Sequence, residues 1–136
     1  MLFRSVEAVT VRAGATFVCC IGATIGKTDI AKVRSAFNQQ LNAVDWGASV
    51  SDLYGLAAMR SLKSTIISRG ASTTLPILKK SSFEQLTIAV PPLPLQQTFA
   101  IRIQAIESLK TTHRAALAEL DALFASLQQR AFAGEL

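Results

Sequence analysis

The stretch Pro91-Pro92-Leu93-Pro94-Leu95-Gln96-Gln97 divides the sequence into two parts of different character. Six of the seven glycines precede this stretch, among the β-branched and apolar residues that are typical of strands and turns. After it, residues 95–133 contain neither Gly nor Pro and consist mainly of good helix formers such as Ala, Leu, Gln and Glu. The sequence therefore predicts a globular part, residues 1–93, followed by one long helix, residues 94–136.

Charge divides at the same place. The chain has 136 residues, with 14 Lys and Arg, 9 Asp and Glu, one His and a formal net charge of +5. Ten of the basic and five of the acidic residues precede Pro94, whereas four of each follow it. The whole positive excess thus lies on the globular part, and it favours an acidic or polyanionic partner. The helix is neutral, as a packing element would be.

Composition excludes several classes of protein. With 50% hydrophobic and 17% charged residues, the chain is too apolar to be intrinsically disordered. Its longest apolar stretches, residues 17–23 and 88–92, are far shorter than the roughly 18 residues that a membrane-spanning helix needs. Residues 1–7 do not have the pattern of a signal peptide. The adjacent Cys19 and Cys20 form no disulfide framework and no zinc site, so we expect a cytoplasmic protein without membrane contact.

The globular part mixes strand and helix patterns and predicts an α+β fold, a small mixed α/β domain. A helix is expected over residues 51–68, capped by Ser49 or Ser51, and Ser81-Ser82-Phe83-Glu84 fits a capping box before a brief helical turn. Strands are expected at residues 16–21, 27–33, 37–44, 75–78 and 87–90, with a looser alternation over residues 6–11. Between these elements, residues 22–26 are expected to form a glycine turn and residues 69–74 a polar loop.

The segment Gly22-Ala23-Thr24-Ile25-Gly26-Lys27-Thr28 looks like a nucleotide-binding phosphate loop but fails its spacing. That motif has four residues between its glycines, whereas three stand here. One residue changes how many backbone N–H groups can converge on a phosphate. The better interpretation is a glycine-supported β-turn, beside which Lys27 and Thr28 can contact a nucleic-acid phosphate.

Other polar segments are candidate DNA contacts. Asn and Gln side chains pair with adenine in the major groove, so Asn38, Gln39 and Gln40 are candidates for base edges. A solvated strand face or a structural amide network is the equal alternative. Residues 69–74 and the two lysines that follow combine cations, hydroxyls and a glycine, which suits phosphate contacts, with an ordinary solvated loop as the alternative. The candidate phosphate contacts are Lys27, Thr28, Arg69, Ser72, Thr73, Lys79 and Lys80.

The sequence shows no set of residues typical of catalysis or metal binding. Cys19 and Cys20 fall in an apolar strand, where alternate faces take the two thiols, so core packing is the expected role. A nucleophilic cysteine would need a base, and the single histidine, His113, lies far away on the helix. Alone, His113 serves neither a catalytic triad nor a metal cluster. We expect no catalytic residue, no metal and no cofactor.

The helix carries the clearest pattern. Its apolar residues recur at spacings of three and four over about four heptads, which is typical of a coiled coil. Residues 95–133 would span roughly 58 Å as a helix, more than a compact core of this size needs, so its far end must pack on something else. The prolines at 91–94 favour a rigid joint into this helix over a ligand for an SH3-type domain. The predicted interface residues are Phe99, Ile103, Ile106, Lys110, His113, Leu117, Leu120, Phe124 and Leu127.

Several segments, taken together and in order, resemble the C-terminal half of the specificity (S) subunit of type I restriction-modification systems. No single segment is specific, but five in sequence are, and they cover nearly the whole chain. They are the apolar strand with Gly22-Ala23-Thr24-Ile25-Gly26-Lys27-Thr28, then Phe37-Asn38-Gln39-Gln40-Leu41-Asn42-Ala43, Leu75-Pro76-Ile77-Leu78-Lys79-Lys80, residues 88–97, and the tail at 115–132.

The resemblance implies a target recognition domain followed by a long helix. In that family the S subunit has no catalysis of its own. Each recognition domain reads one half of a bipartite site in double-stranded DNA, and the subunit recruits adenine-methylating (M) subunits and a restriction (R) subunit. A complete S subunit has two recognition domains, and its two long helices pack antiparallel as a spacer. This chain has one domain and one helix, and the early Gly22 turn implies that an N-terminal portion of the domain is missing.

We therefore expect the second helix to come from a second chain in a homodimer. If Phe99 faces Phe124 of the second chain in antiparallel pairing, Ile103 faces Leu120, Ile106 faces Leu117 and Lys110 faces His113. The two polar interruptions then meet near the two-fold axis, where a polar layer fixes register at some cost in stability. The competing hypothesis is a pure interaction module, whose helix dimerises or docks the methylating subunit and whose domain does not bind DNA. An enzyme is the third and poorest hypothesis.

Overall fold

The computed structural model describes residues 9–71 and 74–135. It divides into two compact units, Met1–Gln97 and Thr98–Leu136. The first unit, called the body below, combines small antiparallel sheets with helices, and the second consists mainly of the long C-terminal helix α4 (Leu93–Phe132), which begins in the body. The predicted α+β class with a long C-terminal helix is confirmed.

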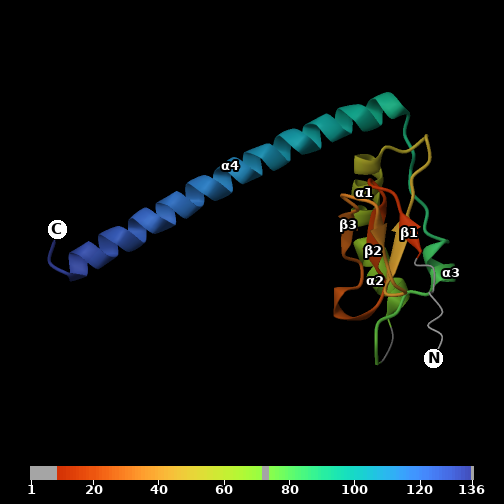
Figure 1. Cartoon of the computed structure of the whole chain (residues 1–136), viewed down its shortest axis with the longest axis horizontal. Coiled ribbons are helices and arrows are strands. Elements are labelled where there is room, and N and C mark those ends of the chain that lie inside the picture. The colour runs from red at the N-terminus through yellow and green to blue at the C-terminus, as the bar shows by residue number, and fades with distance from the viewer. Residues whose placement is uncertain (1–8, 72–73, 136) are drawn as a thin grey trace, which may run out of the picture. The chain divides into compact units, whose positions relative to one another are not determined.

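Two antiparallel sheets form the framework of the body (Figure 1). In the larger sheet, β2 (Thr16–Cys19) is the central strand, with β3 (Thr28–Ile30) on one side and β5 (Leu41–Val44) on the other. In the smaller sheet, β1 (Thr10–Val11) pairs with β4 (Ser35–Ala36). The strands predicted at 16–21 and 27–33 are therefore confirmed, although each is shorter than expected.

The core lies between one face of the larger sheet and the helices. Thr16 and Val18 of β2 are fully buried on this face, whereas Phe17 and Cys19 point to the opposite face and are only half-buried. α1 (Asp52–Ser61) packs on β2 and β3. The buried hydrophobic residues that form the core are Val18, Cys20, Ile25, Met59, Ile66 and Leu78.

The helix predicted over residues 51–68 is interrupted. Ser51 caps α1 as expected, since its hydroxyl accepts a hydrogen bond from the backbone N–H of Tyr54. The Ser61 hydroxyl, however, donates to the carbonyl oxygen of Ala58, the acceptor that a continuous helix would offer to the N–H of Leu62. Leu62 donates instead to Met59, and α2 (Lys63–Gly70) starts after this tight turn. The prediction of one continuous helix was wrong. The predicted loop at 69–74 was also wrong at its start, because Arg69 and Gly70 are the last residues of α2.

Several predicted strands are wrong or shortened, and at residues 37–40 a local hydrogen bond replaces sheet pairing. Residues 37–40 precede β5 as a turn, in which the Asn38 side chain accepts from the N–H of Gln40. Of residues 75–78, only Ile77 forms a bridge, with Ile21, and residues 87–90 form no strand. The short helix α3 (Lys80–Phe83) exists, but no side chain caps it, so the capping box was wrong.

α4 begins at Leu93, one residue before the predicted start of the helix. Its 40 residues correspond to a length of about 60 Å. Pro94 lies in the first turn, where the lack of an N–H is tolerated, and Leu95 donates its N–H to the Pro92 carbonyl at 3.0 Å. Within the described part of the chain, no helix is both long and apolar enough to cross a membrane.

Candidate nucleic-acid interface

The glycine turn between β2 and β3 positions the first candidate contacts. Gly22 and Gly26 have φ angles of 79° and 82°, a left-handed conformation that glycine adopts without strain. Gly26 donates its N–H to Cys19 at 2.8 Å, and Lys27 donates its N–H to Thr24 at 3.0 Å. The predicted glycine-supported turn is confirmed, and it leads Lys27 and Thr28 into the edge strand β3.

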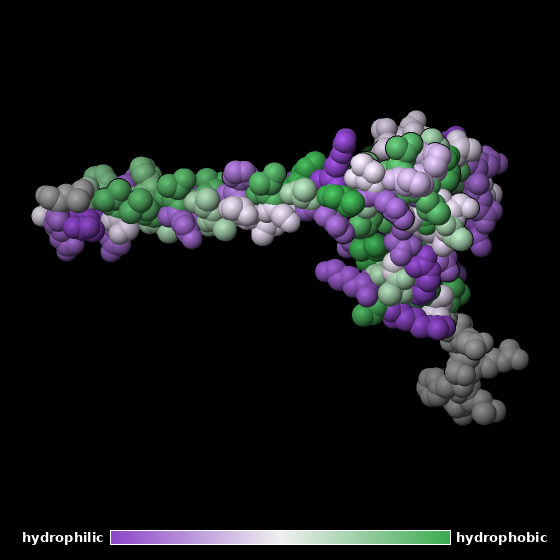
Figure 2. Space-filling model, turned by 90° about the horizontal axis from the view of Figure 1, so that it is seen from above, coloured by the Kyte–Doolittle hydropathy of each residue, from purple (hydrophilic) through white to green (hydrophobic). Residues whose placement is uncertain are grey.

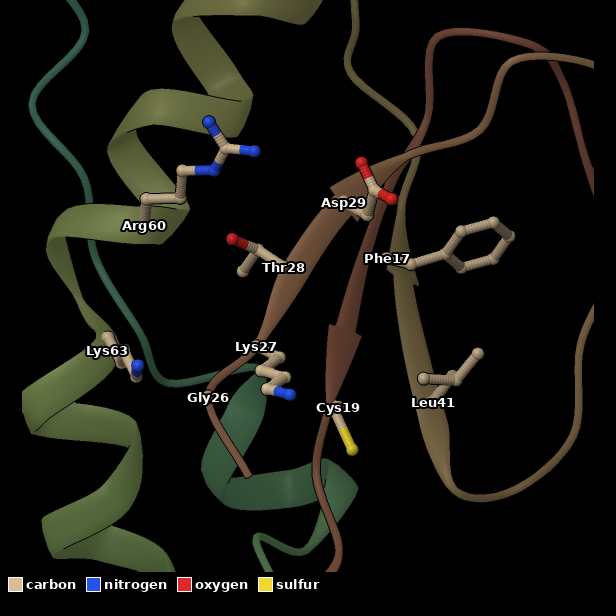
Figure 3. A pocket seen from close by; sticks show the side chains of 9 residues that line it. All are labelled: Phe17, Cys19, Gly26, Lys27, Thr28, Asp29, Leu41, Arg60 and Lys63. Carbon is tan, nitrogen blue, oxygen red and sulfur yellow. The ribbon is translucent and has the colours of Figure 1, made fainter. Parts of the chain in front are cut away.

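Lys27 and Thr28 lie in a pocket of about 670 Å³ along the edge of the larger sheet, called the β3 pocket below (Figure 3). Lys27 extends toward the face of β2 that carries Cys19, while Thr28 faces the helices. Lys27 is exposed, and Thr28 is half-buried. The lining residues are Phe17, Cys19, Gly26, Lys27, Thr28, Asp29, Leu41, Arg60 and Lys63.

Arg60 and Lys63 belong to the β3 pocket although the sequence did not mark them as candidate contacts. Arg60 is in the last turn of α1 and Lys63 is the first residue of α2, and both are exposed. Their spacing of three residues places side chains on the same side of a helix, which was the one available signal. The packing of the helices beside β3 could not be derived from that spacing.

The three consecutive amides lie in the turn before β5, not in a strand. All three residues are exposed. The Asn38 side chain is bonded to the backbone of Gln40, and the Gln40 carbonyl accepts the N–H of Cys20 at 3.0 Å. The turn therefore holds Asn38 through its side chain and presents Gln39 and Gln40 outward. Their contact with base edges stays a prediction.

The remaining candidate cations lie elsewhere on the body. Arg69 is exposed near the end of α2, and Lys79 and Lys80 are exposed at the start of α3. A hydrogen bond of 2.9 Å from Ile77 to the Gly70 carbonyl holds the two segments side by side. Lys80 also lies 3.8 Å from Glu84, which offsets part of its charge. None of these three residues lines the β3 pocket, and Ser72 and Thr73 lie outside the described residues.

Arg12, by contrast, is engaged within the body. Its guanidinium contacts Asp45 at 2.6 Å and Asp52 at 2.9 Å, and it donates to the Trp46 carbonyl at 3.1 Å. The hydrogen bond to Asp52, followed by that to Asp45, raises the pKa of Arg12 above its ordinary value. Arg12 is therefore a structural cation that ties β1 to the start of α1.

The predicted interface positions of α4 form a largely exposed apolar stripe. Ile106, Leu117, Leu120 and Phe124 are 50–64% exposed and Leu127 is 41% exposed, whereas Phe99 and Ile103 are half-buried. Figure 2 shows hydrophobic residues gathered along one side of the helix. Lys110 lies 2.8 Å from Glu107 one turn earlier, and His113 is exposed. Leu109 and Leu123, which the heptad pattern left out, are also exposed and widen the stripe.

The described residues bring together no group of three or more His, Cys, Asp or Glu side chains that could hold a metal ion. The two thiols are free and differ in environment. Cys20 is buried, and Cys19 lies half-buried with its sulfur 3.0 Å from the Thr24 hydroxyl oxygen. The expected core packing therefore holds for Cys20.

A comparison with known families assigns the chain. The model of the type I restriction modification DNA specificity domain matches residues 6–122, which cover most of the body and the larger part of α4. The chain belongs to this family, as the resemblance predicted. Membership supports a role in DNA sequence specificity within a type I restriction-modification system and implies DNA binding. No curated protein matches the chain.

Proposed function

We propose that this chain is a DNA-recognition part of a type I specificity subunit, with no catalysis of its own. Residues 1–93 act as a target recognition domain that binds double-stranded DNA, and residues 94–136 act as the spacer helix. The methylating and restriction subunits are its protein partners. The observation that carries the proposal is the family match over residues 6–122, and the confinement of the net charge to residues 1–93 supports it. Double-stranded DNA as partner and the free thiols favour a cytoplasmic location.

In this proposal, the residues that contact the DNA phosphates differ from those that contact the base edges. The cations and hydroxyls contact phosphates, which fix orientation, and the exposed amides of the turn before β5 read base edges. The exposed positions of Gln39 and Gln40 support the second role. The proposed phosphate contacts are Lys27, Thr28, Arg69, Ser72, Thr73, Lys79 and Lys80.

A salt-dependent gel shift tests DNA binding. The wild-type chain should bind duplex DNA with an affinity that falls steeply as salt rises, because phosphate contacts release counterions. Replacing Lys79 and Lys80 by Ala should weaken binding and flatten the salt dependence. The control is Arg114→Ala with Arg130→Ala, which removes the same charge from α4. Equal binding by the lysine variant and the control would refute these two contacts, and no binding by the wild type would refute the recognition role.

We further propose that two chains associate through antiparallel α4 helices. The exposure of the apolar stripe supports this proposal, since burial of such a stripe is what drives coiled-coil formation. In the predicted register, Lys110 faces His113 of the second chain, and this polar layer sets the alignment. Light scattering checks the association: a dimer is expected, and a strict monomer at high protein concentration contradicts it.

The second candidate function is a protein-interaction module without DNA binding. The same exposed stripe favours it, because the apolar surface of α4 suits any partner helix, including one of the methylating subunit. Two measurements separate the candidates. Co-purification of the chain with the methylating subunit, combined with no gel shift at low salt, would select the interaction module, whereas a salt-dependent shift selects DNA recognition.

A further inference from the structure

Three cations line the β3 pocket without acidic partners. Lys27, Arg60 and Lys63 are all exposed, and none forms an ion pair with another described residue. The lining includes a single acid, Asp29, which is exposed and accepts a hydrogen bond from the neighbouring Ile30 N–H. The pocket thus carries an uncompensated positive charge, which is the local requirement for an anionic ligand.

Two structural features place these residues, which are distant in sequence, along the same edge of the sheet. The first is the buried Gly26, which lies so close to α2 that an added Cβ would be 3.0 Å from the Lys63 side chain and 3.3 Å from the Lys63 carbonyl oxygen. The turn that carries Lys27 therefore packs directly on the start of α2. The second is the tight turn at Leu62, which keeps Arg60 and Lys63 beside the same strand. Figure 3 shows Arg60 extending from α1 toward β3.

The backbone at this pocket is not arranged to hold a terminal phosphate. The N–H groups of Gly22, Gly26 and Lys27 are already bonded to Pro76, Cys19 and Thr24. A nucleotide-binding loop instead directs free N–H groups at the phosphates. The candidate phosphate donors here are side chains, among them three cations, and they lie along the edge strand β3. Cationic side chains along an exposed edge are typical of contacts to the backbone of an extended nucleic acid.

We propose that Arg60 and Lys63, together with Lys27, bind backbone phosphates of duplex DNA along the edge of β3. The Thr28 hydroxyl lies in the same pocket and can donate to a phosphate oxygen. This inference rests on the proposed function and adds two contacts from the α1–α2 junction. It predicts that this edge of the sheet, and not only the α3 lysines, follows the DNA strand.

The test is the variant Arg60→Gln with Lys63→Gln in the full chain. Each lost phosphate contact removes about 0.9 from the slope of log affinity against log salt, so the slope should fall by roughly two. The same relation gives an affinity loss of roughly 30-fold at 0.15 M salt. Arg114→Gln with Arg130→Gln is the matched control for net charge and should bind like the wild type. Lys27→Gln alone should lower the slope by about one.

The outcomes separate this inference from the proposed function. If the wild type binds DNA and the Arg60/Lys63 variant binds with an unchanged slope, the β3 pocket is no phosphate contact, while DNA recognition stands. If the wild type binds no duplex DNA, both the proposed function and this inference are refuted. Titration with inorganic triphosphate is the further arm: tight, saturable binding that the same variant abolishes would make the pocket a site for small phosphates and overturn the inference. Circular dichroism checks that the exposed substitutions leave the fold intact.

Discussion

At the scale of single residues, the contact between Trp46 and Gly55 fixes how α1 lies on the larger sheet. The indole N–H donates to the Thr16 hydroxyl at 2.9 Å, and the ring packs directly against the backbone of Gly55. Gly is otherwise unfavourable within a helix by about 1 kcal/mol relative to Ala. Its presence in the interior of α1 is explained by the ring, because a Cβ at this position would overlap Trp46.

Gly55→Ala should therefore destabilise the body despite its better helix propensity. Overpacking a core typically costs about 1–3 kcal/mol, which exceeds the propensity gain. The free energy of unfolding, measured with urea, should fall. Gly47→Ala is the control, because an added Cβ there meets no atom within 4 Å. An increase in stability for Gly55→Ala would show that Trp46 moves without cost.

The buried Cys20 makes stability depend on pH. Burial raises the pKa of its thiol above the ordinary value of 9.0, and a hydrogen bond from Asn42 offsets part of this effect. The unfolded chain then releases the proton at a lower pH than the native chain, so the thiol's contribution is complete below about pH 9 and is lost as pH rises through the native pKa. The free energy of unfolding should decline above about pH 9.

Cys20→Ala should flatten this decline. The substitution also lowers stability at all pH values, because it leaves space in the core. The informative quantity is therefore the slope between about pH 8 and 10, measured by urea unfolding and compared with Cys19→Ala. Equal slopes for the wild type and Cys20→Ala would refute the role of this thiol.

At the scale of elements, Gln96 connects the start of α4 to the body. Its side chain is fully buried. The amide oxygen accepts from the Ser51 N–H, and the amide nitrogen donates to the carbonyls of Ser49 and Pro91, each at 2.8 Å. One side chain thus satisfies groups at the N-terminus of α1 and in the segment that leads into α4. A loss of these bonds should affect both elements.

Gln96→Glu should destabilise this connection, since a carboxylate cannot donate to the two carbonyls. Leaving buried polar groups unsatisfied costs roughly 1–3 kcal/mol each. The expected result is a lower melting temperature and faster amide exchange at the start of α1. Gln97→Glu, at an exposed neighbouring position, is the control. Unchanged exchange in Gln96→Glu would mean that the hydrogen bonds of Gln96 contribute little.

The elements that sequence reasoning identified depend on local patterns. The β-branched run around Thr16, the serine cap of α1 and the regular spacing of α4 each act within a few residues. The missed features depend on competing hydrogen bonds or on distant partners. The break at Leu62 follows from the Ser61 hydroxyl, and the turn at Asn38 follows from its own side chain. Ser61 and Asn38 are short polar residues, whose side chains can bond to the nearby backbone and interrupt a helix or strand. The apolar patterns used for the prediction did not take this into account.

The candidate interface shows the same limit. The glycine spacing correctly marked Lys27 and Thr28 as neighbours of a tight turn. Arg60 and Lys63 were missed because the packing of α1 on β3 and of α2 on Gly26 brings them to the pocket, and both partners lie about thirty or more residues away in sequence. A sequence pattern contains no distance between such segments, so the pocket could not be assembled without the structure.

At the scale of the whole molecule, the net positive charge and the exposed apolar stripe lie on different parts of the chain. The net charge of +5 belongs to residues 1–93, and the exposed apolar stripe belongs to α4. A polyanion and a partner helix therefore have different surfaces available to them. Because the surfaces are separate, a substitution on α4 can test assembly while the cations of the body stay unchanged.

Leu120→Glu should dissociate the proposed dimer. In the antiparallel register Leu120 faces Ile103 of the second chain, and symmetry repeats this contact, so each dimer loses two buried leucines. Burial of a leucine contributes roughly 1.5–3 kcal/mol, and the loss of two weakens association by about 100-fold or more. Light scattering should give the mass of one chain. Ala122→Glu, at an exposed position on the opposite face of the helix, should remain dimeric. A dimeric Leu120→Glu variant would exclude this register, since a buried carboxylate beside isoleucine is not tolerated.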